Sequence, residues 1–189
     1  MQLVNIIEPF FNEDEFNILI NHFERWKFNA TQQPERTFFE NRLLGYPCYE
    51  SKPLEKGMFC FDVFVKTFEQ KTNLKIKNIK IFFRKVFLNE LKKSPYKNRN
   101  ESTIHTDSFT DNIHLAGVIY MNNTSLDNGT KIYKDLLSME PTIIVGANPN
   151  RCVFYEPNLV HSASIDWRIE VRKTIVFFIE LDNYDTKSK

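Results

Sequence analysis

Short apolar runs, each closed by a turn signal, fill the second half of the chain and limit its fold most strongly. One run extends over residues 114–122 and is followed by the turn sequence Asp-Asn-Gly-Thr at 127–130. A second run, residues 151–156, alternates apolar and polar side chains and is broken by Pro-Asn at 157–158. A third run covers residues 172–180. Runs of this length, rich in β-branched and aromatic residues and bounded by turn residues, predict β-strands.

The first half of the chain shows helical periodicity instead. Asn12, with Glu15 three residues later, has the pattern of a capping box at the start of a helix. The apolar residues of this helix recur at helical spacing, at Phe16, Leu19, Ile20, Phe23 and Trp26. A second helix is predicted to end near residues 72–73, with one apolar face made of Met58, Phe61, Val65 and Phe68. Helices followed by strands, without strand–helix–strand alternation, predict an α+β protein whose sheets form a jelly-roll, or double-stranded β-helix.

The length and composition of the chain fit one domain. The 189 residues include 42% hydrophobic residues and 18 phenylalanines, which is enough to build a buried core. We therefore expect a single domain over residues 1–189. Within it, we expect a supporting segment at about 1–78, a jelly-roll core at about 79–182 and a short polar tail at 183–189.

Charge and cysteine usage bear on partners and location. A formal net charge of +1 creates no general attraction for nucleic acid or an anionic membrane, and we expect neither as a partner. The N-terminus lacks the features of a signal peptide, and the apolar runs are too short to span a bilayer. The three cysteines show no pairing pattern, which fits a reducing compartment. The expected location is the cytoplasm, that of the host if the source is viral.

His105 and Asp107, separated by one residue, and the distant His161 carry the chemistry that the strands frame. In a strand, residues i and i+2 point to the same side, so His105 and Asp107 would both project inward, and His161 would come from a neighbouring strand. Two imidazoles and one carboxylate on one face of a metal form the arrangement of non-heme Fe(II) oxygenases, which leaves other coordination positions open. The alternative is a histidine of the core beside an aspartate in a turn.

The order of these residues resembles the 2-oxoglutarate/Fe(II)-dependent dioxygenase superfamily, and within it the prolyl-hydroxylase-like branch. The resemblance covers about residues 83–180. It implies that His105, Asp107 and His161 are the ligands of the iron.

The resemblance also implies a binding site for the far carboxylate of 2-oxoglutarate. Arg172 and Thr174 occupy the places of the basic residue and the hydroxyl that follow the distal histidine. Tyr120, in the sequence Tyr-Met-Asn, occupies the place of a tyrosine that reaches the same carboxylate in some relatives. Lys173 and Arg168 are rivals for the basic position. Strand alternation puts Arg172 and Thr174 on one face and so favours Arg172 over Lys173.

The activity implied by the resemblance is the hydroxylation of an unactivated C–H bond with Fe(II), 2-oxoglutarate and O2, releasing succinate and CO2. Asp107 stands where halogenating relatives carry a small residue, which favours hydroxylation over chlorination. The substrate would be an amino acid, a peptidyl side chain or a small metabolite, since the last strand lacks the second arginine of the nucleic-acid-repair branch. Two other classes fit the same residues: a cupin-like metal protein that does not use 2-oxoglutarate, and a non-catalytic binding module on this scaffold.

Several features near these residues have two interpretations or depart from the family. Relatives have a Gly-Gly-Thr turn where residues 128–130 read Asn-Gly-Thr, and often a Tyr-x-x-Gly turn where Tyr96 lacks the glycine, so Tyr96 is left without a role. Residues 29–56 and 92–101 are either lids over the site or surface loops. His114 either faces the substrate or caps a strand.

Overall fold

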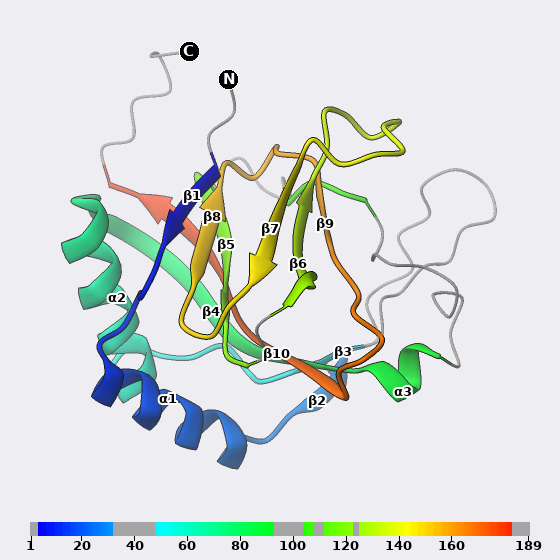
Figure 1. Ribbon diagram of the computed structural model, residues 1–189. Coiled ribbons are helices and arrows are strands. Elements are labelled where there is room, and N and C mark those ends of the chain that lie inside the picture. The colour runs from blue at the N-terminus through cyan, green and yellow to red at the C-terminus, as the bar shows by residue number, and fades with distance from the viewer. Residues whose placement is uncertain (1–3, 32–47, 93–103, 108–111, 123–124, 183–189) are drawn as a thin grey trace.

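Two antiparallel sheets packed face to face form the centre of the molecule (Figure 1). The structure is a computed structural model that describes residues 4–31, 48–92, 104–107, 112–122 and 125–182. The larger sheet consists, in spatial order, of β1 (Val4–Ile7), β8 (Cys152–Tyr155), β5 (Leu115–Tyr120), β10 (Val171–Leu181), β4 (Ile76–Phe87), β3 (Cys48–Glu50) and β2 (Asn29–Thr31). The smaller sheet consists of β7 (Ile143–Ala147), β6 (Ser125–Ile132) and β9 (His161–Ala163).

Two helices, α1 (Glu13–Arg25) and α2 (Phe59–Thr72), cover the outer face of the larger sheet, and a single turn, α3 (Leu88–Leu91), follows β4. The capping box predicted for α1 is confirmed. The side chain of Asn12 accepts a hydrogen bond from the Glu15 amide at 2.8 Å, and the Glu15 carboxylate accepts one from the Asn12 amide at 3.4 Å. The α+β arrangement of helices outside and strands inside follows the sequence prediction.

The apolar face predicted for α2 is partly wrong. Cys60, Phe64 and Phe68 are the apolar residues that the helix buries against the sheet. Of the predicted face only Phe68 is among them, while Met58, Phe61 and Val65 pack half-buried at its margin. Because α2 is apolar on more than one side, sequence periodicity alone did not define its buried face. The helix ends at Asn73, whose φ of 58° is the left-handed conformation common after a C-terminal turn.

Strand β10 lies between β5 and β4 and divides the two hydrophobic layers. Ile175, Phe177 and Ile179 point outward to the helices. Opposite them, Thr174 and Val176 point inward, because inward-facing Tyr120 and Val118 of β5 lie directly across from them. The expected alternation along β10 therefore places Arg172 in the interior. Residues 76–87 form the single twelve-residue β4, which α3 follows directly.

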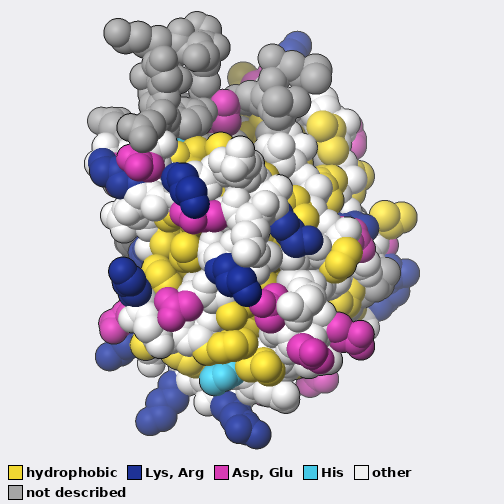
Figure 2. All heavy atoms as spheres, turned by 90° about the vertical axis from the view of Figure 1, so that its left-hand side faces the viewer, with side chains coloured by type: hydrophobic (Ala, Val, Ile, Leu, Met, Phe, Trp, Pro, Cys, Tyr) yellow, Lys and Arg dark blue, Asp and Glu magenta, His cyan; other side chains and the backbone are white. Residues whose placement is uncertain are grey.

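The outer surface over the helices carries mixed charges. Figure 2 shows lysine and arginine side chains interspersed with aspartate and glutamate on this face. Within the residues that the structure describes, no helix is long and apolar enough to cross a membrane.

Candidate metal centre

His105 and His161 lie side by side because their backbones pair directly. The amide of each residue donates a hydrogen bond to the carbonyl of the other, both at 2.9 Å. Asp107 is anchored next to them by its own amide, which donates to the carbonyl of Pro157 at 2.7 Å. His161 is the first residue of β9, as expected of a ligand from a neighbouring strand. Residues 104–107, predicted as a strand, form only this isolated bridge.

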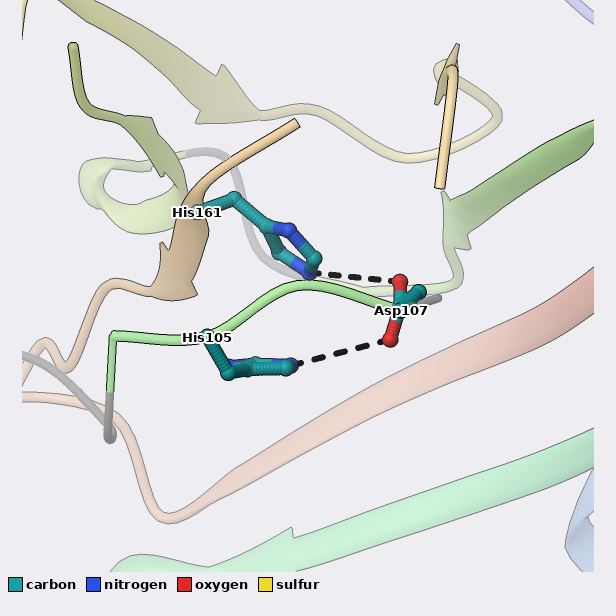
Figure 3. A group of neighbouring side chains, drawn as sticks. All are labelled: His105, Asp107 and His161. Atoms are coloured by element: carbon teal, nitrogen blue, oxygen red, sulfur yellow. Dashed lines mark ion pairs between the residues drawn. The ribbon is translucent and has the colours of Figure 1, made fainter. Parts of the chain in front are cut away.

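The three side chains converge (Figure 3). Nε2 of His161 lies 3.3 Å from Oδ2 of Asp107, and Nε2 of His105 lies 3.7 Å from Oδ1 of the same carboxylate. One ligand atom from each residue lies within 4.8 Å of the other two. Metal bonds of about 2.1 Å place neighbouring ligand atoms about 3 Å apart, so small side-chain rotations bring these atoms onto one cation.

The environment of His161 prepares one of its ring nitrogens for a metal. Its Nδ1 lies 2.9 Å from the carbonyl oxygen of Leu159. Because a carbonyl only accepts, Nδ1 donates this hydrogen bond, and Nε2, on the side of Asp107, is the nitrogen left to bind a metal ion in place of a proton. His161 is buried, with 6% of its surface exposed, whereas the His105 side chain is 39% exposed. The centre is therefore closed around His161 and opens beside His105.

The carboxyl of Asp107 stays ionised. Burial acts to raise its pKa, but the hydrogen bond and charge of His161, followed by the charges of His105 and Arg84, lower it further, so the net pKa lies below its usual value. An ionised carboxylate beside two imidazoles is the donor set expected for a divalent iron.

Arg172, Thr174 and Tyr120 meet in the interior between the sheets. Thr174 lies directly opposite Tyr120 across the β10–β5 pairing. The guanidinium carbon of Arg172 is 5.6 Å from the centroid of the Tyr120 ring. The Tyr120 hydroxyl bonds to that of Thr130 at 2.7 Å. All four side chains are buried, so the group is shielded from water.

The two rivals of Arg172 lie elsewhere. Lys173 points to the opposite face of β10, where its Nζ lies 2.5 Å from a Glu24 carboxylate oxygen. Arg168 has a side chain that is 73% exposed, and it pairs with Asp166 and Asp127.

Several buried polar atoms in this interior have no hydrogen-bond partner in the described part of the chain. They are Nε of Arg172, Oγ1 of Thr174 and both side-chain amide atoms of Asn128. No carboxylate among the described residues forms an ion pair with Arg172. An unpartnered buried polar atom costs about 1–3 kcal/mol, and a buried cation without a counterion costs more. Of these atoms, Nε of Arg172, Oγ1 of Thr174 and Nδ2 of Asn128 can donate to a ligand that carries a carboxylate.

Asn128 is a residue that the sequence analysis did not assign to the site. Its side chain is 1% exposed and follows that of Asp127, which is 68% exposed, so the two point in opposite directions. The available signal was the departure from Gly-Gly-Thr, because a side chain stands where relatives have none.

His114 and the two loops are accounted for in part. The Nδ1 atom of His114 accepts a hydrogen bond from the Leu181 amide at 2.9 Å, which fixes the end of β10. Of residues 29–56, the described ends form β2 and β3 at the edge of the larger sheet. Tyr96, and residues 93–101 of the second loop, lie outside the described residues.

Known proteins are similar to this chain in structure. No protein-family model matches the chain, and no curated protein sequence matches it either. A prolyl-4-hydroxylase from Pseudomonas putida is similar with a TM-score of 0.63 at 13% identity, over 97% of this chain and 95% of that one. A Trichoplax adhaerens prolyl hydroxylase, solved with a peptide fragment of the hypoxia inducible factor oxygen degradation domain, gives 0.61 at 14% identity, over 94% and 83%.

A third similar structure contains ligands. HygX from Streptomyces hygroscopicus, solved with nickel and 2-oxoglutarate bound, has a TM-score of 0.59 at 9% identity, over 96% of this chain and 84% of that one. Identities this low speak for the fold alone. The chain therefore has the jelly-roll fold predicted from its sequence, the fold of solved 2-oxoglutarate–Fe(II) oxygenases that include prolyl hydroxylases.

Proposed function

We propose that this chain is a 2-oxoglutarate- and Fe(II)-dependent oxygenase that hydroxylates an unactivated C–H bond of an amino-acid, peptidyl or small-metabolite substrate. Succinate and CO2 are the co-products. The observation that carries the proposal is the convergence of two imidazoles and a carboxylate in the same jelly-roll that buries an arginine to which no described residue supplies a counterion.

Each residue has a defined task in this proposal. His105, Asp107 and His161 hold Fe(II), and the ion bound there supplies the activation of O2 coupled to oxidation of the keto acid. Arg172 binds the far carboxylate of 2-oxoglutarate, because its planar fork offers parallel N–H donors. Thr174 has an unengaged hydroxyl that can donate to the same carboxylate. Tyr120 supports the guanidinium with the face of its ring.

The buried arginine argues against the two alternatives. A cupin-like protein without 2-oxoglutarate needs no buried cation in this interior, and neither does a binding module that has lost its chemistry. Retaining an uncompensated buried charge is costly, so a ligand that neutralises it is the simplest explanation.

We propose small-molecule or peptidyl substrates, a cytoplasmic location, and no nucleic-acid or membrane partner. The peptide bound to the similar prolyl hydroxylase supports a peptidyl substrate. The three free, buried cysteines support a reducing compartment. The formal net charge of +1 offers no general attraction for nucleic acid.

Anaerobic metal loading followed by a product screen tests the proposal. Wild-type protein should retain Fe(II) after desalting and release succinate in the presence of O2 and a suitable substrate, whereas Asp107→Ala should do neither. His114→Ala serves as the matched control, because His114 lies outside the centre and should leave the iron content unchanged. Equal iron content in wild type and Asp107→Ala would overturn the assignment.

A further inference from the structure

A row of polar side chains crosses the interior face of the larger sheet beyond the proposed co-substrate site. Thr174 lies opposite Tyr120 on one side and opposite Arg84 of β4 on the other, and Arg84 lies opposite Glu50 of β3. Residues directly opposite each other in antiparallel strands project to the same face. Arg84 and Glu50 therefore face the same interior as Tyr120 and Thr174, on the far side of β10.

The contacts of Arg84 confirm this orientation. Its guanidinium carbon lies 5.3 Å from the centroid of the Phe82 ring, and that ring stacks on Phe178 with centroids 6.1 Å apart. Phe82 and Phe178 lie on the interior face, in register with the inward-facing Val176 and Ala116. The guanidinium thus packs on the Phe82 ring.

The metal centre faces the same interior. The ring of Tyr155, which lies opposite the inward-facing Ala116, contacts the ring of His161 with centroids 4.7 Å apart. The side chains of Arg84 and Glu50 are 23% and 20% exposed, so they are reachable from solvent. Arg172, by contrast, is 5% exposed. The two arginines therefore differ in access, as expected if one serves the co-substrate and the other a ligand that enters later.

The Arg84–Glu50 pair leaves part of its binding capacity unused. Nε and Nη2 of Arg84 both donate to the same oxygen, Oε1 of Glu50, at 2.8 and 2.5 Å. Within the described residues, Nη1 of Arg84 and Oε2 of Glu50 have no hydrogen-bond partner. Nη1 therefore has N–H groups that can bind an anion, and Oε2 is an acceptor that can bind a cation.

We propose that Arg84 and Glu50 bind the substrate, and that the substrate is a free amino acid. Nη1 of Arg84 receives the α-carboxylate, Oε2 of Glu50 receives the α-ammonium group, and the side chain of the amino acid extends into the interior between the sheets. The inference rests on the proposed function, because it names the substrate class of that site. A pair with only a structural role would join β3 to β4 and recognise nothing.

Anaerobic spectroscopy tests the proposed function and the proposed substrate class separately. The visible charge-transfer band of the Fe(II)–2-oxoglutarate complex reports the proposed function, and a change in that band on adding a free L-amino acid reports the substrate. Each proteinogenic L-amino acid is titrated, together with its N-acetyl and its carboxamide forms. We expect at least one free amino acid to perturb the band, and both blocked forms of it to bind at least about tenfold more weakly, as expected when one charged hydrogen bond is lost.

Substitutions at Arg84 and Glu50 distinguish a role in substrate recognition from a role in joining β3 to β4. Glu50→Gln should reduce the discrimination against the N-acetyl form, and Arg84→Gln should reduce the discrimination against the carboxamide, each measured relative to the band of the same variant without amino acid. Lys77→Gln, which removes another cross-strand ion pair of β4, that with Glu180, is the control and should alter neither ratio. If the glutamine variants do not fold, Arg84→Lys and Glu50→Asp carry the same comparison.

Three results would overturn the inference while leaving the oxygenase intact. The first is a band that no free amino acid perturbs. The second is a blocked form that binds as well as the free one. The third is a set of variants that weaken free and blocked forms equally. Absence of the band itself would instead count against the proposed function.

Discussion

At the scale of single residues, the most informative side chain is one that lacks a partner. Arg172 is buried at 5% exposure, and its Nε atom has no acceptor in the described part of the chain. A charge in this condition destabilises the ligand-free protein and becomes favourable only when an anion arrives. We therefore expect the carboxylate of a bound ligand to neutralise Arg172 in the interior.

Replacing this arginine should separate binding from stability. In Arg172→Gln the carboxylate of 2-oxoglutarate loses its buried counterion, which costs about 2–5 kcal/mol, so 2-oxoglutarate affinity should fall by more than about tenfold. The ligand-free protein should unfold at the same or a higher temperature, because an unpaired buried charge is gone. Calorimetry of 2-oxoglutarate binding to Mn(II)-loaded protein, together with thermal unfolding, measures both.

Lys173→Gln is the matched control for this prediction. Lys173 is the next residue, but it points outward to Glu24, so its loss should leave 2-oxoglutarate affinity unchanged. Equal affinity losses in the two variants would contradict the assignment of Arg172.

The Asp166 carboxylate gives a prediction for pH. The hydrogen bond from Arg168 is the largest influence on its pKa, burial opposes it, and a bond from Ser125 adds to it, so the pKa lies well below the ordinary value of an aspartate. A lowered native pKa contributes stability that is present above the unfolded value and is lost as the pH falls toward the native value. Asp166→Asn should therefore cost about 1.5–3 kcal/mol at neutral pH.

This cost should shrink as the pH falls below about 4, the ordinary range of an aspartate pKa. Urea unfolding of wild type and Asp166→Asn across the acid range measures the difference in the free energy of unfolding. A difference that stays constant with pH would show that the carboxylate charge is not the source of the stability.

At the scale of elements, β6 is held so close to β7 that one position admits only glycine. A Cβ atom on Gly129 would lie 1.7 Å from the carbonyl oxygen of Val145. Gly129→Ala must therefore push the two strands apart. We expect the free energy of unfolding to fall by about 1–3 kcal/mol or more, the range seen for overpacked sites. Thermal unfolding checks this prediction.

Gly146→Ala provides the comparison within the same hairpin. A Cβ atom there would meet Cδ2 of Leu126 at 2.9 Å, in an exposed side chain that can turn away, and the backbone of Leu126 and Ser125 at 3.1 and 3.3 Å, which needs shifts of only a few tenths of an ångström. Its effect should be clearly smaller. Equal losses at the two positions would mean that the β6–β7 backbone contact is not the cause.

Local sequence patterns predicted the positions of helices and strands better than they predicted what these elements contact. Alternation in β10 correctly separated the inward Thr174 from the outward Lys173, because strand geometry has a period of two. The capping box of α1 was equally local. The buried face of α2 was misjudged, because its apolar residues surround more than one side and the sheet selects among them. Residues 104–107 were predicted as a strand but form a single bridge, since Asp107 bonds to Pro157 instead.

At the scale of the whole molecule, the arrangement of strands depends on pairings between distant segments. Joining β4 to β10 brings residues about ninety positions apart into register, which no local pattern reports. Arg84 and Glu50 reach the interior only through pairings of this kind, so neither could be identified as a site residue from the sequence alone. His105, Asp107 and His161 were different, because their residue types and spacing, together with the strands around them, predict a metal site. Asn128 was visible only as a departure from a family turn.

The central claim is that one interior binds Fe(II) through His105, Asp107 and His161 and 2-oxoglutarate through Arg172. Anaerobic titration of the apoprotein with Fe(II) and 2-oxoglutarate, followed in the visible range, tests both halves at once. We expect a charge-transfer band in wild type, no band in His161→Ala, and a band in Arg172→Gln only at much higher 2-oxoglutarate concentration. No band in wild type, or a full band in His161→Ala, would contradict it.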